Sequence, residues 1–197
     1  MEISALVPLA IYIFVMTITP GPNNMMLASS GLVFGIGRSV PHILGITSGV
    51  ALQLLLTGFG LGTIFAAEPA IQFALKVLGT AYLFWLSSRL WQAGAPESVS
   101  SPRPINFREA AVFQFINPKA WLIAVTICSV FLSSQYSMLL QITVFSLAFL
   151  AVGAPSMLAW VCFGASVRRL TTNSHRIRLI NRIMAGLTAF TGAMFWM

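Results

Sequence analysis

Six apolar stretches, each long enough to cross a bilayer, follow one another along this chain. A membrane-spanning helix needs about 20 mainly apolar residues. Stretches of this kind lie near residues 5–33, 43–66, 70–91, 110–133, 137–164 and 178–197. The pattern predicts an all-α integral membrane protein with six transmembrane helices.

One polar stretch interrupts the series and divides the chain into two halves. Residues 92–109, QAGAPESVSSPRPINFRE, are rich in Pro, Ser and Gly, which is typical of a flexible linker. Residues 1–91 and residues 110–197 then form two repeats with three spans each. Because three is an odd number, the two halves must have opposite orientations in the membrane, which is the arrangement of an inverted repeat.

Positive charges gather in alternate connections between the spans. The first, third and fifth connections hold Arg38, then Arg103 and Arg108, then Arg168, Arg169, Arg176 and Arg178. The other two connections, AAEPAI and SSQYS, contain no Lys or Arg. Since cytoplasmic loops collect Lys and Arg, this pattern predicts that both termini face away from the cytoplasm. No small-residue cleavage site follows the first apolar run, so this segment is expected to remain as a span.

The composition agrees with a bilayer as the solvent. The chain is 57% hydrophobic and 8% charged, whereas about a quarter of the residues in a soluble domain are charged. The net charge of +7 is divided among connections that alternate with apolar spans, so nucleic acid is not an expected partner. Cys128 and Cys162 lie inside apolar runs and are interpreted as packing residues.

Two of the spans contain helix-breaking sequences near their centres. The first span contains ITPGPNNMM, with Pro20, Gly21 and Pro22, and the fourth contains FQFINPKAW, with Pro118. Each proline removes a backbone donor and crowds the carbonyl four residues earlier. Freed backbone groups are tolerated at membrane depth only where protein or a water-filled cavity receives them. Matched interruptions in two inverted halves therefore predict a substrate site of a transporter, with packing kinks as the alternative.

Polar side chains at the two breaks are the candidate substrate-binding residues. These are Asn23, Asn117 and Lys119, with Gln53 from the second span as a further candidate. Helix N-termini attract a carboxylate and unwound carbonyls attract an ammonium group, so the pair of breaks suits an α-amino acid. A Lys at the centre of a span costs about 2.5–3.5 kcal/mol on insertion scales, and we therefore interpret Lys119 as facing a cavity rather than snorkelling to the interface.

Proton coupling has few candidate residues. No Asp or Glu lies in the middle of any span, and Glu109 lies at the start of the fourth. Glu109 and Lys119 are thus the candidates for titration if protons are the coupling ion.

The two breaks carry a resemblance to a known family. TPGPNNMM at 19–26 and FINPKAW at 115–121 resemble the signature stretches of the LysE/RhtB family of amino-acid exporters, and KVLGTAYLFWLSSRLW at 76–91 is similar to that family's third span. The resemblance covers essentially the whole chain. It implies a bacterial inner-membrane carrier that exports amino acids or close derivatives, with both termini periplasmic by the charge pattern.

The same resemblance narrows the substrate. Members of the family export basic residues, homoserine, threonine, leucine, cysteine or O-acetylserine, and the doubled Asn23-Asn24 resembles the cysteine/O-acetylserine exporters. No embedded carboxylate is present to neutralise a cationic side chain, so a neutral amino acid is favoured. By motif match, Pro20 to Asn23 form the first break and Asn117 to Lys119 the second.

Other functions receive less support from the residues. The sequence contains no recognisable enzyme motif and predicts neither a cofactor nor a resident metal. A divalent metal-cation exporter is the first alternative, although hard cations need clustered oxygen ligands. A non-transporting scaffold subunit is the second. Gly45 and Gly49 form a small-residue pair that allows close helix packing and permits, without requiring, a homo-oligomer.

Overall fold

The regular elements of the described chain are helices throughout, which confirms the predicted all-α class. The computed structural model describes residues 5–92, 103–169 and 174–196. The elements are α1 (Leu6–Ile18), α2 (Pro22–Phe34), α3 (Ile36–Leu56), π-helical η2 (Thr57–Leu61), α4 (Gly62–Ala67), α5 (Pro69–Gln92), α6 (Phe107–Ile116), α7 (Pro118–Phe131), α8 (Met138–Ala148), π-helical η3 (Phe149–Gly153), α9 (Ala154–Arg169), α10 (Ser174–Ala193) and the 3₁₀ turn η4 (Met194–Trp196).

Within the described residues, up to five of the six predicted spans are long and apolar enough to cross a membrane. Three are continuous, namely Ile36–Leu61, Pro69–Gln92 and Met138–Val167, and two are the bent pairs α1 with α2 and α6 with α7. The sixth predicted span corresponds to α10, which carries three arginines and is not among them. The six-span inverted repeat therefore stays a prediction.

Two of the predicted connections are shorter than the sequence suggested. A single residue, Gly35, separates α2 from α3, so Arg38 lies in the first turn of α3 and not in a loop. Gly35 has φ 81°, a left-handed conformation that glycine adopts without a steric penalty. The predicted linker 92–109 also ends earlier, because Asn106 caps α6 and the helix begins at Phe107; residues 93–102 lie outside the described residues.

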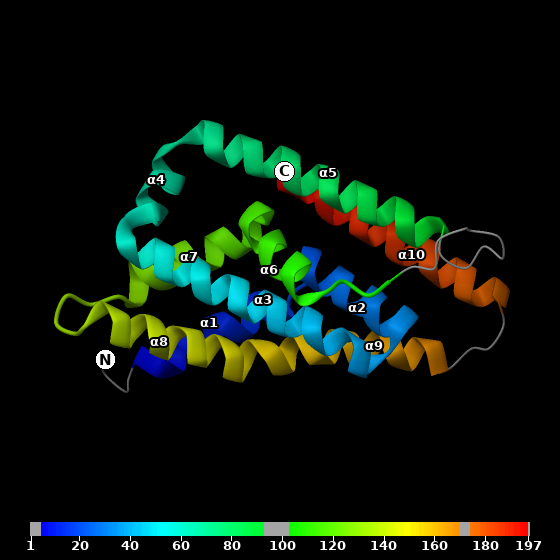
Figure 1. Ribbon diagram of the computed structural model, residues 1–197, viewed down its shortest axis with the longest axis horizontal. Helices are drawn as coiled ribbons and strands as arrows, with labels where there is room; N and C mark the ends of the chain where they lie inside the picture. Colours follow the sequence, from blue (N-terminus) through cyan, green and yellow to red (C-terminus); the bar gives the residue numbers. More distant parts are fainter. Residues whose placement is uncertain (1–4, 93–102, 170–173, 197) are drawn as a thin grey trace.

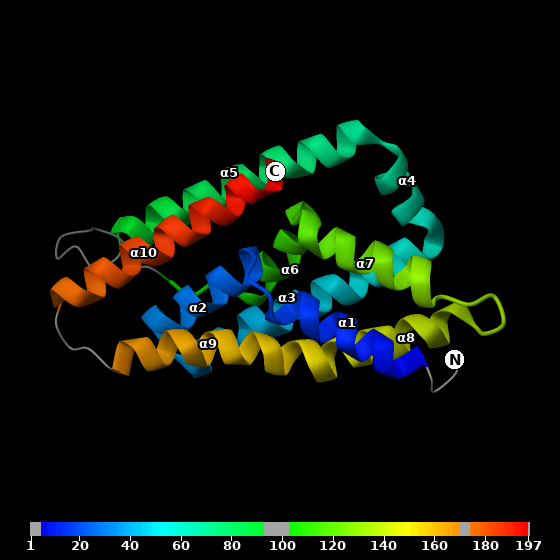
Figure 2. The ribbon, with the colours of Figure 1, turned by 180° about the vertical axis from the view of Figure 1, so that it is seen from behind.

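The helices of the two halves pack against one another rather than as separate bundles. Figures 1 and 2 show α2 along α9, α3 along α6, and α5 along α10. The first broken segment thus contacts the fifth predicted span, and the second broken segment contacts the second. These contacts between the halves bury most of both breaks: Gly21, Pro22 and Asn117 are buried, whereas Pro20 is exposed.

Glycine allows the closest of these approaches. A Cβ on Gly31 would overlap the carbonyl of Val161, and a Cβ on Gly164 would overlap the carbonyl of Ala28. Gly45 is placed in the same way against the carbonyl of Phe107, which confirms the packing role expected of this residue. Backbone-to-backbone contact at these points brings α2 onto α9 and α3 onto α6.

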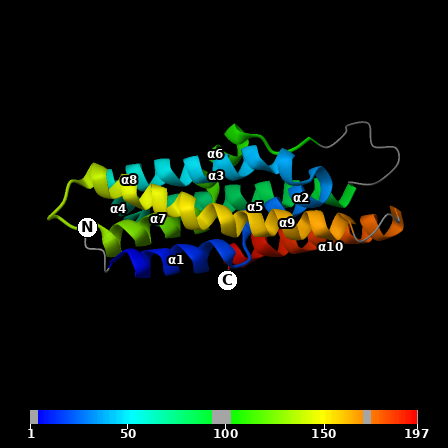
Figure 3. The ribbon, with the colours of Figure 1, turned by 90° about the horizontal axis from the view of Figure 1, so that it is seen from below.

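One end of the bundle carries most of the arginine-bearing junctions, and we call it the arginine-rich end. There α2, α5 and α9 finish and α3 and α10 begin, while the α4–α5 junction and the α7–α8 loop lie at the opposite end (Figures 1 and 3). This grouping agrees with the sidedness expected from the charge pattern, although the orientation in a membrane stays a prediction. From this end α10 and η4 extend to the middle of α5, where Trp196 Nε1 donates to Thr80 Oγ1 at 2.9 Å.

Candidate functional site

The structure confirms helix breaks at both predicted positions. Helix α1 ends at Ile18 and α2 begins at Pro22, with an angle of 59° between them. Helix α6 ends at Ile116 and α7 begins at Pro118, with an angle of 74°. In each case a proline occupies the first position of the second helix, where its missing N–H leaves no intrahelical bond unmade.

The two breaks face each other across a small cavity, which we call the central cavity. Its volume is about 30 Å³, and Asn23, Asn24, Asn117 and Lys119 line it together with apolar residues of α3 and α9. This is roughly the volume that one water molecule occupies in the liquid. The central cavity is therefore too small for an amino acid, which can enter only if the surrounding helices move apart, and we call this arrangement the closed state.

Lys119 joins one break to the other. Its Nζ donates to Thr19 Oγ1 at 2.9 Å, to the Thr19 carbonyl at 3.2 Å and to the Pro20 carbonyl at 3.3 Å. The side chain lines the central cavity, as expected, instead of running outward to the interface. The unwound carbonyls that the sequence suggested for a substrate ammonium thus hold the ammonium of Lys119 in this closed state.

Asn23 is paired with a residue that the sequence did not single out. Its Nδ2 donates to Gln114 Oε1 at 2.8 Å, and Gln114 Nε2 donates back to Asn23 Oδ1 at 3.2 Å. Gln114 Nε2 also donates to the carbonyl of Ala110 at 2.8 Å. Gln114 is fully buried, and its place in the centre of a span was the only signal in the sequence that pointed to it.

Gln53, predicted as a cavity residue, has a different position. It is fully buried and does not line the central cavity; its Nε2 donates to the carbonyl of Gln114 at 2.9 Å. That carbonyl lies four residues before Pro118, which has no N–H to offer it. The backbone N–H of Asn117 also donates to this carbonyl, at 3.2 Å, so Gln53 supplies a second donor to the backbone at the second break.

The other two asparagines cap the broken helix ends. Asn24 Nδ2 donates to the carbonyls of Thr17 and Thr19, both at 2.7 Å. Asn117 is the N-cap of α7, and its Oδ1 accepts the N–H of Lys119 at 3.1 Å. Asn24 was noted only as half of a doubled asparagine, and its capping role could not be assigned before the path of the break was known.

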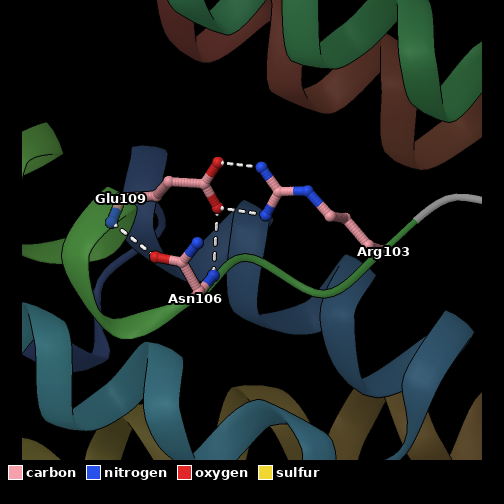
Figure 4. A network of polar contacts seen from close by, with 3 residues as sticks. All are labelled: Arg103, Asn106 and Glu109. Atoms are coloured by element: carbon pink, nitrogen blue, oxygen red, sulfur yellow. Dashed lines mark hydrogen bonds and ion pairs between the residues drawn. The ribbon is translucent and has the colours of Figure 1, made fainter.

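Glu109, the other predicted titrating residue, lies away from the central cavity. Its carboxylate accepts hydrogen bonds from the Arg103 guanidinium, one of them at 2.8 Å, and from the backbone N–H of Asn106 at 3.1 Å (Figure 4). The Asn106 side chain accepts the N–H of Glu109 at 2.9 Å, which completes a capping box at the start of α6. Hydrogen bonds to Glu109 raise the pKa of the Arg103 guanidinium above its ordinary value.

In the part of the chain that the structure describes, the two cysteines and the acidic side chains do not form a metal site. Cys128 lies in α7 and Cys162 in α9, and both are free thiols. Across residues 5–92, 103–169 and 174–196, no three His, Cys, Asp or Glu side chains gather in a group that could hold a metal ion.

Comparison with known proteins gives one family. Residues 14–197 match the family model described as LysE type translocator. The chain is 27% identical to the cysteine/O-acetylserine efflux protein of Salmonella choleraesuis (strain SC-B67) over 179 residues, 91% of each chain. It is 28% identical to the cysteine/O-acetylserine efflux protein of Escherichia coli O157:H7 over 159 residues, which are 81% of this chain and 82% of the relative. No solved structure gives a significant match.

Proposed function

Because the chain belongs to the LysE type translocator family, we propose that it exports a small neutral amino acid, or a close derivative, from the cytoplasm through the bacterial inner membrane. Family membership indicates a membrane transporter of amino acids and not an enzyme. Two relatives named cysteine/O-acetylserine efflux proteins support that substrate class for this chain. The threonine/homoserine and leucine classes are the next candidates.

One observation carries the proposed substrate site: Lys119 of the second break binds the freed carbonyls of the first. A primary ammonium group is accepted there by Thr19 and Pro20. The ammonium group of an α-amino acid has the same charge and the same donors. The site thus has chemistry suited to the substrate, and in the closed state it is filled by a side chain of the protein.

The proposed binding step is an exchange of partners. The substrate ammonium takes the Thr19 and Pro20 carbonyls, and the released Lys119 pairs with the substrate carboxylate. The N-terminus of α7, where Asn117 is the cap, adds a positive dipole end at the same cavity. Asn23 supplies its amide once its pair with Gln114 opens.

The lining of the central cavity supports a neutral side chain on the substrate. Among the described residues it contains no carboxylate, and its remaining walls include apolar residues such as Ile46, Val50 and Met157. A cationic side chain would enter this cavity without a counter-ion and would lose its hydration. A short, uncharged side chain needs no counter-ion and has no charge whose hydration would be lost.

Alternating access is the proposed mechanism. The central cavity has to expand to admit a substrate, and the helices of the two halves are interleaved around it, so one set of helices would rock against the other. For proton coupling we assign Lys119 rather than Glu109. Lys119 lines the cavity, whereas Glu109 is bound to Arg103 away from it.

An export assay tests the function and the site together. Cells that produce the wild type, Lys119→Ala, Lys76→Ala or no exporter are fed dipeptides, and the medium is profiled for amino acids by mass spectrometry. Lys76 is the matched control, because it is the other lysine of the chain and lies in α5 outside the central cavity. We expect one or a few neutral amino acids to rise with the wild type and Lys76→Ala only, at equal membrane abundance. Full export by Lys119→Ala would overturn the site, and no rise with the wild type would overturn the function.

A further inference from the structure

A second and larger cavity opens between α2, α5 and the segment that leads into α6. Its volume is about 160 Å³, and we call it the arginine cavity, since Arg89 and Arg103 line it together with Ser29, Tyr82, Trp85 and Glu109. We propose that the arginine cavity is a second substrate site, which binds the carboxylate of a small amino acid on its way to the central cavity. This inference rests on the proposed export function and adds a site to it.

The charges of the arginine cavity suit a ligand that carries a carboxylate. The guanidinium of Arg89 lies 5.5 Å from the ring centre of Trp85, and no ion pair of the described residues includes Arg89. Arg103 is paired with Glu109. Arg89 is thus the cation available to a ligand carboxylate, which guanidinium groups bind with two parallel hydrogen bonds. Because the Glu109 carboxylate is already bound to Arg103, we expect the cavity to recognise a ligand through its carboxylate and not through its ammonium group.

Ser29 gives an independent indication of a ligand. Its side chain lines the arginine cavity and is 4% exposed, yet its hydroxyl has no hydrogen-bond partner within the described chain. The neighbouring Ser30 is satisfied, because its hydroxyl is 2.8 Å from the hydroxyl of Ser39. Buried hydroxyls in helices normally bond to a carbonyl of the preceding turn. The Ser29 hydroxyl is covered in this structure, and it would gain a partner if a polar ligand in the cavity displaced the side chains over it.

The size of the cavity fits the same class of ligand. An engineered cavity of about 150 Å³ holds a benzene molecule. The arginine cavity is of similar volume, so it admits an amino acid with a short side chain. The arginine-rich end of the bundle, toward which it lies, is the end that the charge pattern assigns to the cytoplasm, where an exporter collects its substrate.

A thin layer of side chains separates the arginine cavity from the central cavity. Met26 lines the arginine cavity, and Asn23, one turn earlier on α2, lines the central one. Met26 and Phe113 are both buried in one apolar cluster, and the Phe113 ring lies 4.7 Å from that of Tyr82. The Asn23–Gln114 amide pair closes the same layer. Opening of this layer would join the two sites.

The first test separates the two sites by kinetics. Transport of O-acetyl-L-serine is measured in vesicles with the wild type, Arg89→Gln and Arg108→Gln. Arg108 is the matched control, because it precedes Glu109 in the same helix turn but does not line the cavity. Loss of a charged hydrogen-bond partner should raise the KM of Arg89→Gln roughly tenfold or more, with kcat within about twofold of the wild type, and leave Arg108→Gln unchanged. An unchanged KM for Arg89→Gln would overturn the proposal.

The second test needs no transport. In a background with Cys128→Ala and Cys162→Ala, the Ser29→Cys variant in nanodiscs is labelled with N-ethylmaleimide in the presence of three probes. O-acetyl-L-serine has both charges, 3-acetoxypropionate has only the carboxylate, and 2-aminoethyl acetate has only the amine. We expect the two carboxylates to slow labelling at least threefold and the amine to have no effect. Adding Lys119→Ala should leave this protection intact, and adding Arg89→Gln should abolish it.

The remaining outcomes also decide the question. Absence of labelling without a ligand would overturn the proposal, since a closed cavity cannot receive a solute. Protection that depends on phosphatidylglycerol in the nanodisc, and not on the added carboxylate, would assign the cavity to a lipid headgroup instead. If the wild type transports nothing but carboxylates still protect the Ser29→Cys variant, the proposed function fails while the second site stands.

Discussion

The side-chain amides of Asn23 and Gln114 form two reciprocal hydrogen bonds, at 2.8 and 3.2 Å, between residues 91 positions apart in the chain. Asn23 lies in the first turn after one helix break, and Gln114 lies in the last turn before the other. Each amide offers the other both a donor and an acceptor, which suits two polar groups away from water. The pair therefore couples the positions of the two broken helices.

A double-mutant cycle on this pair should show strong coupling. Asn23→Ala or Gln114→Ala alone removes a donor and an acceptor from the partner amide, so each should lower kcat/KM for export at least tenfold. The double variant should have a kcat/KM no lower than that of the less active single variant. The coupling energy should be about 0.5–3 kcal/mol. The measurement is the initial export rate at low substrate, corrected for membrane abundance. Losses that multiply in the double variant would show that the two residues act separately.

Substitution of Gly21 should impair export because the added side chain would meet Lys119, and not because the Gly21 backbone requires glycine. Its φ is 177°, an extended conformation that any residue adopts, but an added Cβ would lie 3.0 Å from Lys119 Nζ and 3.1 Å from Lys119 Cδ. Gly21→Ala should move the ammonium from the Thr19 and Pro20 carbonyls and lower export several-fold at unchanged abundance. In a Lys119→Ala background the same change should have no further effect. An equal further loss in that background would point to the backbone instead.

The contact between α2 and α9 depends on the absence of a side chain at Gly31. A Cβ there would overlap backbone atoms of Val161, which cannot rotate aside as a side chain can. Gly31→Ala should therefore destabilise the fold by about 1–3 kcal/mol, the usual cost of overpacking, and lower the midpoint of thermal unfolding in detergent. Gly37→Ala is the control, because a Cβ at this helical position meets nothing within 4 Å. It should have no effect or be stabilising by about 0.5–1 kcal/mol. Equal unfolding midpoints for the two variants would contradict this account.

The sequence predicted those parts of the site that local chemistry determines. Proline removes a backbone donor, and helix breaks were found at Pro22 and Pro118 as predicted, although Pro41 lies inside the continuous helix α3. The cost of a Lys at the centre of a span likewise indicated that Lys119 faces the interior. The partners of these residues were not predictable. Lys119 binds Thr19, 100 positions away, and Gln53 serves a carbonyl 61 positions away. Such pairs depend on which helices lie side by side, and the interleaving of the two halves is not encoded in any short stretch.

The same reasoning explains why the arginine cavity was missed. Arg89 was not a candidate residue, and Arg103 was counted only as a charge in the connection between the third and fourth spans. Ser29 carries no local signal, since serines are common on packed helices. Their proximity follows from the way α5 lies beside α2 and the segment before α6.

The capping box at the start of α6 should contribute to stability but not to transport. Asn106 Oδ1 accepts the N–H of Glu109, and loss of an N-cap costs about 1 kcal/mol, so Asn106→Ala should lower the thermal unfolding midpoint. Asn106→Ser retains an N-cap acceptor and should restore most of the loss. The bonds of Glu109 to Arg103 and to the backbone N–H of Asn106 do not involve the Asn106 side chain, so the KM for export should be the same in all three proteins. A raised KM in Asn106→Ala that Asn106→Ser does not correct would show that this amide itself contacts the substrate.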